Sequence, residues 1–108
     1  FSTAVPPAPT PNPMGFLAVP TQVLLSDGFY HTMTAMTAVD STGSSVGVEY
    51  YFQCVTYPEI SSGWISSSSY SVRVGAIGWP KTYDWRVRAR DVWGNVTQWS
   101  PGFRAGGN

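Results

Sequence analysis

The sequence predicts an all-β protein, folded as a two-sheet antiparallel sandwich of about seven strands. Three observations support this prediction. Short runs of residues alternate apolar and polar side chains, which is the period of a strand with one buried face. Turn residues such as glycine, proline, asparagine and serine separate these runs at near-regular spacing. No segment shows the longer apolar period of an amphipathic helix.

Composition limits the function before any motif does. The chain has 108 residues, enough for one domain with its own core. Its formal net charge is zero and 11% of the residues are charged, which argues against nucleic acid and against a polybasic membrane contact. No apolar run approaches the length that spans a bilayer. Aromatic residues make up 15% of the chain, so either the core is unusually aromatic or some rings are exposed for binding.

Both ends of the chain are predicted to be linkers. Residues 1–13 are rich in proline and threonine, a composition that favours extended polyproline segments over a sheet ladder. The module is expected at 14–104, and 105–108 is expected to be a linker remnant. A linker of this kind beside a small β domain is typical of modular secreted bacterial proteins.

The first half of the module predicts two strands and a polar loop. Residues 14–25 suit an edge strand that is interrupted at Pro20, because proline cannot donate a ladder hydrogen bond. A turn at Asp27-Gly28 leads into a second strand at 29–38. Polar residues at 39–45 then predict a loop.

The run Val46–Val55 is a clear strand pattern. Its alternation places one set of side chains inward, namely Val48, Tyr50, Phe52 and Cys54, and one set outward, namely Glu49, Tyr51 and Gln53. A lone cysteine cannot form an internal disulfide, so we expect an inert buried thiol rather than a reactive one.

Two shorter strands and a connection follow. Trp64–Ser66 predicts a short strand and Tyr70–Val74 a longer one, with a serine-rich turn between them. The connection Gly75–Lys81 carries Trp79 at its crest.

The stretch from Tyr83 to Ser100 predicts a hairpin. Its first strand alternates an inward set (Tyr83, Trp85, Val87, Ala89) with an outward set (Asp84, Arg86, Arg88, Arg90). Gly94-Asn95 tolerates the positive φ of a tight turn, and Val96–Trp99 predicts the returning strand. We expect Trp99 to close the core beneath Trp85.

The hairpin residues resemble the last two strands of a fibronectin type III domain, in the form that bacteria attach to secreted enzymes. The resemblance lies in Tyr83 and the alternate apolar positions after it, then in Asp91, Gly94-Asn95, Thr97 and Trp99-Ser100. It implies an immunoglobulin/fibronectin type III-like sandwich. It also implies a tyrosine corner, in which the Tyr83 hydroxyl bonds to backbone just upstream.

The residues suggest little catalytic chemistry. His31 has no serine or cysteine that its spacing brings near, so a catalytic triad is not expected. Asp84 and Glu49 could face one groove as glycosidase carboxylates do, but pairing with Arg86 and Arg88 explains them as well.

Three oxygen-bearing side chains could meet at one end of the sandwich. Asp40, Asp91 and Asn95 would suit calcium if their loops converge. The alternative is that each bonds its own loop backbone, as Asp and Asn commonly do. We expect the domain to fold without calcium or any other cofactor.

The surplus tryptophans suggest a surface that binds sugar. Trp64 should flank the face that carries Glu49, Tyr51 and Gln53, while Trp79 and Trp93 lie in loops. An indole face matches the C–H face of a pyranose ring, and polar neighbours can bond its hydroxyls. The alternative is that each indole is an ordinary half-buried edge residue.

With its linker, the chain resembles the non-catalytic carbohydrate-binding modules of bacterial glucanases, in particular a small soil-bacterial family that binds cellulose and related β-glucans. This implies a secreted, monomeric module, linked to a glycoside hydrolase, that holds the enzyme on its polymer. The sugar-binding residues expected from sheet geometry are Trp64, Tyr51, Gln53, Arg86 and Arg88, with Glu49 and Gln98 at the margins and either Trp93 or Trp79, with Trp93 favoured, as an extension. The rival hypothesis is a fibronectin type III-like spacer or protein-interaction domain.

Overall fold

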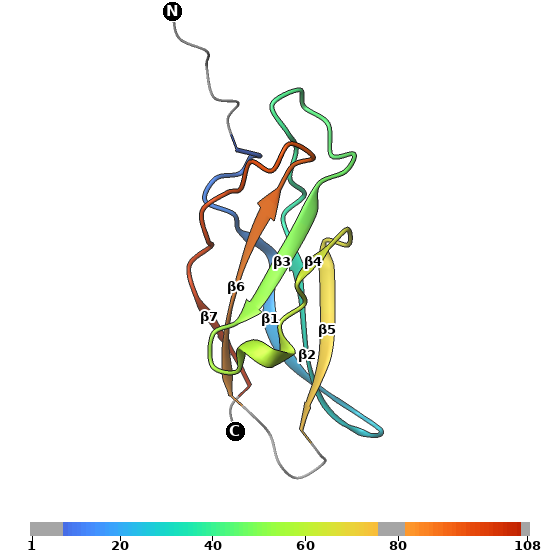
Figure 1. The fold of residues 1–108 in the computed structure, drawn as a ribbon. Helices are drawn as coiled ribbons and strands as arrows, with labels where there is room; N and C mark the ends of the chain where they lie inside the picture. Colours follow the sequence, from blue (N-terminus) through green and yellow to red (C-terminus); the bar gives the residue numbers. More distant parts are fainter. Residues whose placement is uncertain (1–7, 76–81, 107–108) are drawn as a thin grey trace, which may run out of the picture.

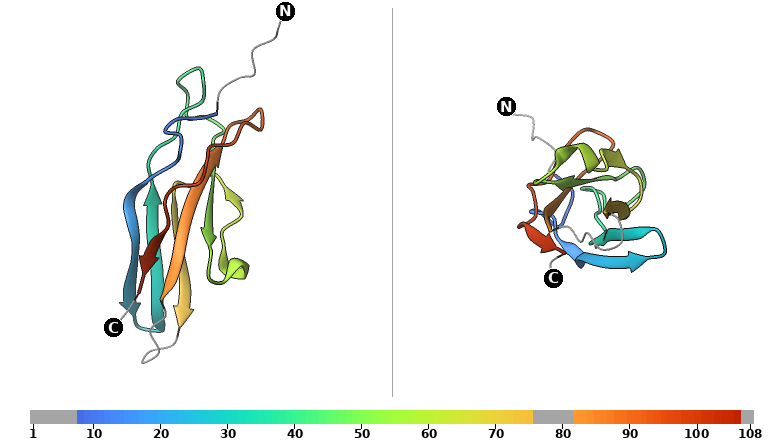
Figure 2. Two further views of the ribbon diagram at one scale, coloured as in Figure 1. Left: turned by 90° about the vertical axis from the view of Figure 1, so that its left-hand side faces the viewer. Right: turned by 90° about the horizontal axis from the view of Figure 1, so that it is seen from below.

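The computed structural model describes residues 8–75 and 82–106, which form two antiparallel sheets packed face to face (Figures 1 and 2). The three-stranded sheet has the order β1 (Phe16–Leu25), β2 (Gly28–Ala35), β5 (Ser69–Gly75). The four-stranded sheet has the order β4 (Trp64–Ile65), β3 (Glu49–Cys54), β6 (Tyr83–Arg90), β7 (Phe103–Ala105). A 3-10 turn, η1 (Pro58–Ile60), lies between β3 and β4. The division of strands between the sheets is immunoglobulin/fibronectin type III-like, which confirms the predicted fold class.

The core lies between the sheets and follows the predicted alternation of β3 and β6. Phe52 on β3 and both Trp85 and Val87 on β6 are fully buried, and Met33 contributes from β2. The outward residues of both strands are half-buried. Burial of one face therefore fixes the register of the two central strands, since a slip of one residue would expose the whole apolar set.

The N-terminal strand is an edge strand with irregular pairing, as Pro20 predicted. The register between β1 and β2 shifts twice, between Phe16 and Ala18 and again between Ala18 and Thr21. Pro20 lies inside the second shift, where its missing N–H costs no ladder bond.

The prediction that Val96–Trp99 forms the returning strand of the hairpin is wrong, because the described residues 91–102, between β6 and β7, contain no regular strand. An isolated bridge joins Val96 to Arg90, and regular pairing with β6 resumes at β7, which begins at Phe103. Between them Thr97 and Ser100 bond β6 with both backbone and side chain, and their N–H groups donate to the carbonyls of Ala89 and Val87, both at 2.8 Å. The Oγ1 of Thr97 accepts from the N–H of Ala89, and the Oγ of Ser100 accepts from the N–H of Val87, both at 3.0 Å.

Ser100 therefore takes the place of a ladder carbonyl. Replacing Ser100 with alanine leaves the buried Val87 N–H without an acceptor, and we expect a loss of about 1–2 kcal/mol of unfolding free energy. Urea unfolding measures this directly. Ser66→Ala is the matched control, because Ser66 is exposed at the end of β4 and should change stability by less than about 0.5 kcal/mol. Equal unfolding midpoints for the two variants would contradict the assigned role of Ser100.

Parts of both predicted linkers pack on the sandwich. Pro9 is fully buried, and Thr10 exchanges two backbone hydrogen bonds with Val39, at 2.9 and 3.0 Å. At the other end Ala105 is buried and pairs with Tyr83. The described fold therefore extends a few residues beyond 14–104 at its N-terminal side and by one residue at its C-terminal side.

His31 is a core residue on β2. Its Nδ1 accepts a hydrogen bond from the indole N–H of Trp85 at 3.1 Å, and its Nε2 lies 3.2 Å from the Gln22 side-chain oxygen. An indole N–H can only donate, so the imidazole proton sits on Nε2 and points to Gln22. The ring of Tyr83 packs edge-on against His31 at 5.5 Å between centroids. The upstream backbone that the tyrosine corner would use falls outside the described residues.

Candidate functional site

The outer face of the four-stranded sheet brings together six of the eight expected site residues. Antiparallel pairing sets Tyr51 on β3 opposite Trp64 on β4 and, on its other side, opposite Arg88 on β6. The same ladder sets Gln53 opposite Arg86, and Glu49 opposite Arg90. The predicted adjacency of these strands is confirmed.

Three aromatic rings lie next to one another on this face. The Tyr51 ring meets Trp64 at 5.4 Å between centroids and Trp99 at 5.6 Å, each at 88°. Edge-to-face packing of this kind is favourable for aromatic pairs. Tyr51 thereby links the β4 edge to the segment that returns along β6.

Three arginines of β6 alternate with these rings. The guanidinium carbons of Arg86 and Arg88 lie 4.2 and 4.3 Å from the Trp99 ring centroid. Both guanidinium groups therefore pack over the same indole. Arg90 lies 4.3 Å from the centroid of Trp64, and Arg88 lies 5.5 Å from it. We name this set of side chains the arginine–aromatic row: Arg86, Arg88, Arg90, Tyr51, Trp64 and Trp99.

The prediction that Trp99 closes the core beneath Trp85 is wrong. Trp85 is fully buried, as predicted, but Trp99 is half-buried on the opposite face of the sheet. The reason is the irregular return along β6. Thr97 and Ser100 turn inward to bond the backbone of β6, and Trp99 between them turns outward onto the arginines.

The charges on this face pair differently from the expectation. Glu49 binds Arg90, with its Oε1 accepting from Nε at 2.9 Å and from Nη2 at 2.7 Å. Asp84 binds Arg104 of β7 at 3.1 Å. Neither carboxylate pairs with Arg86 or Arg88, because cross-strand register selects the partner, not proximity in sequence.

The two carboxylates do not face one groove. Glu49 lies opposite Arg90 and Asp84 lies six residues away along β6, a separation of about 20 Å at the rise of a strand. Glycosidase carboxylate pairs stand about 5–9.5 Å apart. Glu49 and Asp84 therefore cannot act together as such a pair.

The remaining expected residues lie away from the row. Gln98 is exposed beside Trp99, and its backbone N–H donates to the side-chain oxygen of Asn12 at 2.8 Å. Trp93 is 58% exposed in the loop after β6. Trp79 falls outside the described residues.

Asp40 and Asp91 each cap their own loop, as the backbone-bonding alternative predicted. The Oδ1 of Asp91 accepts from the N–H groups of Trp93 and Asn95, and its Oδ2 accepts from the Asn95 side chain. The Oδ1 of Asp40 accepts from the hydroxyl and N–H of Thr42 and from the N–H of Ser44. Within residues 8–75 and 82–106, no three His, Cys, Asp or Glu side chains lie close enough together to hold a metal ion.

These loop bonds predict acid sensitivity. Burial raises the pKa of Asp91, but the hydrogen bonds from Asn95 and Trp93 outweigh it and hold that pKa below its ordinary value. The Thr42 hydroxyl, followed by the Ser44 N–H, lowers the pKa of Asp40. Since both carboxylates are more acidic in the folded state than in the unfolded chain, their stabilisation is present above the ordinary pKa of 3.8 and is lost as pH falls through the folded values.

Melting temperatures from circular dichroism, measured between pH 6 and pH 2, should therefore fall steeply below about pH 4. Asp91→Asn removes one titrating group, so its melting temperature should depend less on pH over the same interval. A wild-type melting temperature that stays constant to pH 2 would contradict this assignment.

Cys54 fits the expected inert thiol. It is fully buried, and its Sγ accepts from the Tyr57 N–H at 3.3 Å. Burial, the largest influence, raises the pKa of the thiol, which keeps it protonated and unreactive.

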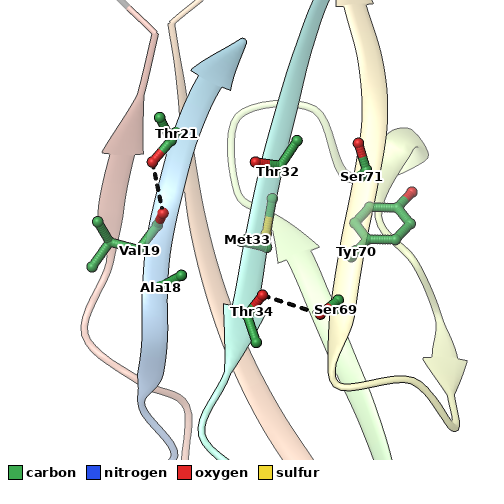
Figure 3. A pocket seen from close by; sticks show the side chains of 9 residues that line it. All are labelled: Ala18, Val19, Thr21, Thr32, Met33, Thr34, Ser69, Tyr70 and Ser71. Carbon is green, nitrogen blue, oxygen red and sulfur yellow. Dashed lines mark hydrogen bonds between the residues drawn. The ribbon is translucent and has the colours of Figure 1, made fainter.

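A second candidate surface, which the sequence did not predict, lies on the outer face of the other sheet (Figure 3). A hollow of about 290 Å³ there is lined by hydroxyl residues from all three strands, namely Thr21, Thr32, Thr34, Ser69 and Ser71, together with Ala18, Val19, Met33 and Tyr70. The register places Thr21, Thr32 and Ser71 in one row across the sheet. The Tyr70 ring stacks on Phe52 and its hydroxyl donates to the carbonyl of Ile60, so the hollow offers no ring face for stacking.

Comparison of the chain with protein-family models, with curated proteins and with solved structures finds no match. Within residues 8–75 and 82–106, no helix is long and apolar enough to cross a membrane.

Proposed function

We propose that this domain is a non-catalytic carbohydrate-binding module for β-glucan chains, secreted by a bacterium and linked to a glycoside hydrolase. The observation that supports it best is the arginine–aromatic row on the outer face of the four-stranded sheet. Aromatic C–H and ring surfaces alternate there with guanidinium donors, which is the chemistry that pyranose rings and their hydroxyls require. The row crosses three adjacent strands, so it suits the interior of an extended polymer.

The packing of the row changes the expected mode of binding. Two guanidinium groups already pack over the Trp99 ring, so Trp99 is not among the proposed stacking residues. The proposed contacts are the Tyr51 and Trp64 rings against sugar C–H groups, and Arg86, Arg88 and Gln53 as partners for hydroxyls. Arg86 Nε already donates to the Gln53 side-chain oxygen at 2.6 Å, which orders both groups before a ligand arrives.

A spacer or protein-interaction domain is the second candidate. The observation that favours it is the same covering of Trp99, because guanidinium groups stacked on an indole also stabilise a sheet that binds nothing. Fold alone does not separate these functions.

Two measurements separate the candidates. The binding module should be retained on insoluble cellulose, and cellohexaose should shift its tryptophan fluorescence; Trp64→Ala should weaken this binding by about 1–3 kcal/mol. Trp93→Ala is the control, since Trp93 is exposed in a loop away from the row. Absence of retention together with an unchanged emission spectrum would reject the binding module and favour the spacer.

A further inference from the structure

Arg88 occupies the centre of the arginine–aromatic row. Its guanidinium carbon lies 4.3 Å from the Trp99 ring centroid, 5.5 Å from Trp64 and 5.9 Å from Tyr51. Its Nε is buried and has no hydrogen-bond partner among the described residues. Among the described residues, three aromatic rings therefore lie near this cation and no carboxylate forms a salt bridge with it.

The neighbouring charges do not neutralise the face. Arg90 is paired with Glu49, whereas Arg86 donates to the neutral Gln53 side chain. Among the described residues, the salt bridges join Arg90 to Glu49 and Arg104 to Asp84, which leaves Arg86 and Arg88 without a carboxylate. Two uncompensated positive charges thus lie beside each other in a protein whose net charge is zero.

We propose that the arginine–aromatic row prefers an acidic polysaccharide, one whose sugar residues carry carboxylates, over a neutral glucan. This inference depends on the proposed carbohydrate-binding function. A guanidinium group binds a carboxylate through paired, charge-assisted hydrogen bonds, and aromatic neighbours that exclude water strengthen the attraction.

The arrangement fits a charged sugar polymer better than other polyanions. Arg86 and Arg88 leave the sheet roughly 7 Å apart on one strand, so a chain with repeated carboxylates can reach both. The rings of Tyr51 and Trp64 supply apolar contact for sugar C–H groups between these charges. Two free charges are too few for the concentrated basic field that nucleic acid binding requires.

The test compares two soluble polymers that share a β-glucan backbone. Carboxymethylcellulose carries carboxylates and hydroxyethylcellulose is neutral. At low salt we expect wild-type protein to bind carboxymethylcellulose at least about tenfold more tightly, as charge-assisted bonds to one guanidinium imply. Raising the salt to about 0.5 M should remove most of this preference.

Arg88→Gln should lose the preference, because its loss of affinity should be larger for carboxymethylcellulose, which forms a charge-assisted bond, than for hydroxyethylcellulose, which loses only a neutral hydroxyl contact. Arg73→Gln is the matched control, since Arg73 lies on β5 in the other sheet and donates to the carbonyl of Asp27. It removes the same charge from the protein and should keep the preference. If near-ultraviolet circular dichroism shows that Arg88→Gln does not fold, the salt titration of the wild-type protein tests the inference instead. A preference for carboxymethylcellulose that persists at about 0.5 M salt would then contradict it.

Equal affinity for the two polymers would overturn the inference and leave the proposed function standing. Failure to bind either polymer or insoluble cellulose would reject both. Equal binding of polyglutamate or of single-stranded DNA would also overturn it, because the row would then select charge alone. Preference for carboxymethylcellulose over all of these supports it.

Discussion

Replacing Trp85 with alanine is expected to lower the free energy of unfolding by about 3–5 kcal/mol, the usual cost of truncating a fully buried aromatic side chain. The indole is the largest fully buried side chain among the residues that the structure describes, and its ring also packs edge-on against Tyr70 at 6.0 Å. Its loss also removes the N–H donor to His31 Nδ1. A loss of about 3–5 kcal/mol is a large fraction of the stability of a small domain, so the variant should be partly unfolded at 37 °C.

Trp85→Phe separates the two contributions. It keeps most of the apolar bulk but cannot donate to His31, so its loss in a urea titration should be smaller than that of Trp85→Ala and should report mainly on the hydrogen bond. A Trp85→Ala protein that unfolds at the same urea concentration as the wild type would show that the inward and outward faces of β6 have been assigned the wrong way round.

Alternation was enough to predict the two central strands and the face that each residue occupies. The inward residues of β3 and β6 are buried, except for the half-buried Tyr83 at the start of β6, and the outward ones are half-buried, because only one register hides the apolar set. Strand ends were less predictable. β3 begins at Glu49 and not at Val46, since Gly47 adopts a φ of 78° and Val46 is 80% exposed.

The returning strand was not predictable from alternation. The hydroxyls of Thr97 and Ser100 accept hydrogen bonds from backbone N–H groups of β6. The two residues between them do not follow the inward–outward alternation of a strand. The place of Trp99 depends on this irregularity. The bond between His31 and Trp85 likewise joins residues 54 apart in sequence, and nothing in the local pattern indicates it.

Part of the candidate site did follow from the sequence. Tyr51, Gln53, Arg86 and Arg88 share a face because each lies at an outward position of adjacent strands, as expected. Which arginine pairs with Glu49 depends on register, and so does the alternation of guanidinium groups with rings. The sequence therefore predicted the members of the face but not the contacts that give the face its chemistry.

Replacing Trp99 with alanine is expected to destabilise the domain by about 2–4 kcal/mol, even though the ring lies on the outer face of the sheet. The variant loses the contacts of the Trp99 ring with two guanidinium groups and its edge-to-face contact with Tyr51. Arg86 and Arg88 then lose the ring on which both guanidinium groups pack, so nothing offsets their mutual repulsion there. Urea unfolding at low and at high salt measures the change, and added salt should recover part of the loss by screening this repulsion.

Trp93→Ala is the matched control for Trp99→Ala. Both variants remove an indole from the same stretch of chain. Trp93 is exposed in a loop away from the row, so Trp93→Ala should change stability by less than about 0.5 kcal/mol. If both variants unfold alike, the guanidinium contacts to Trp99 contribute nothing measurable. That result would leave the indole free to turn toward a ligand, and Trp99 would then join Tyr51 and Trp64 as a stacking residue in the cellohexaose titration.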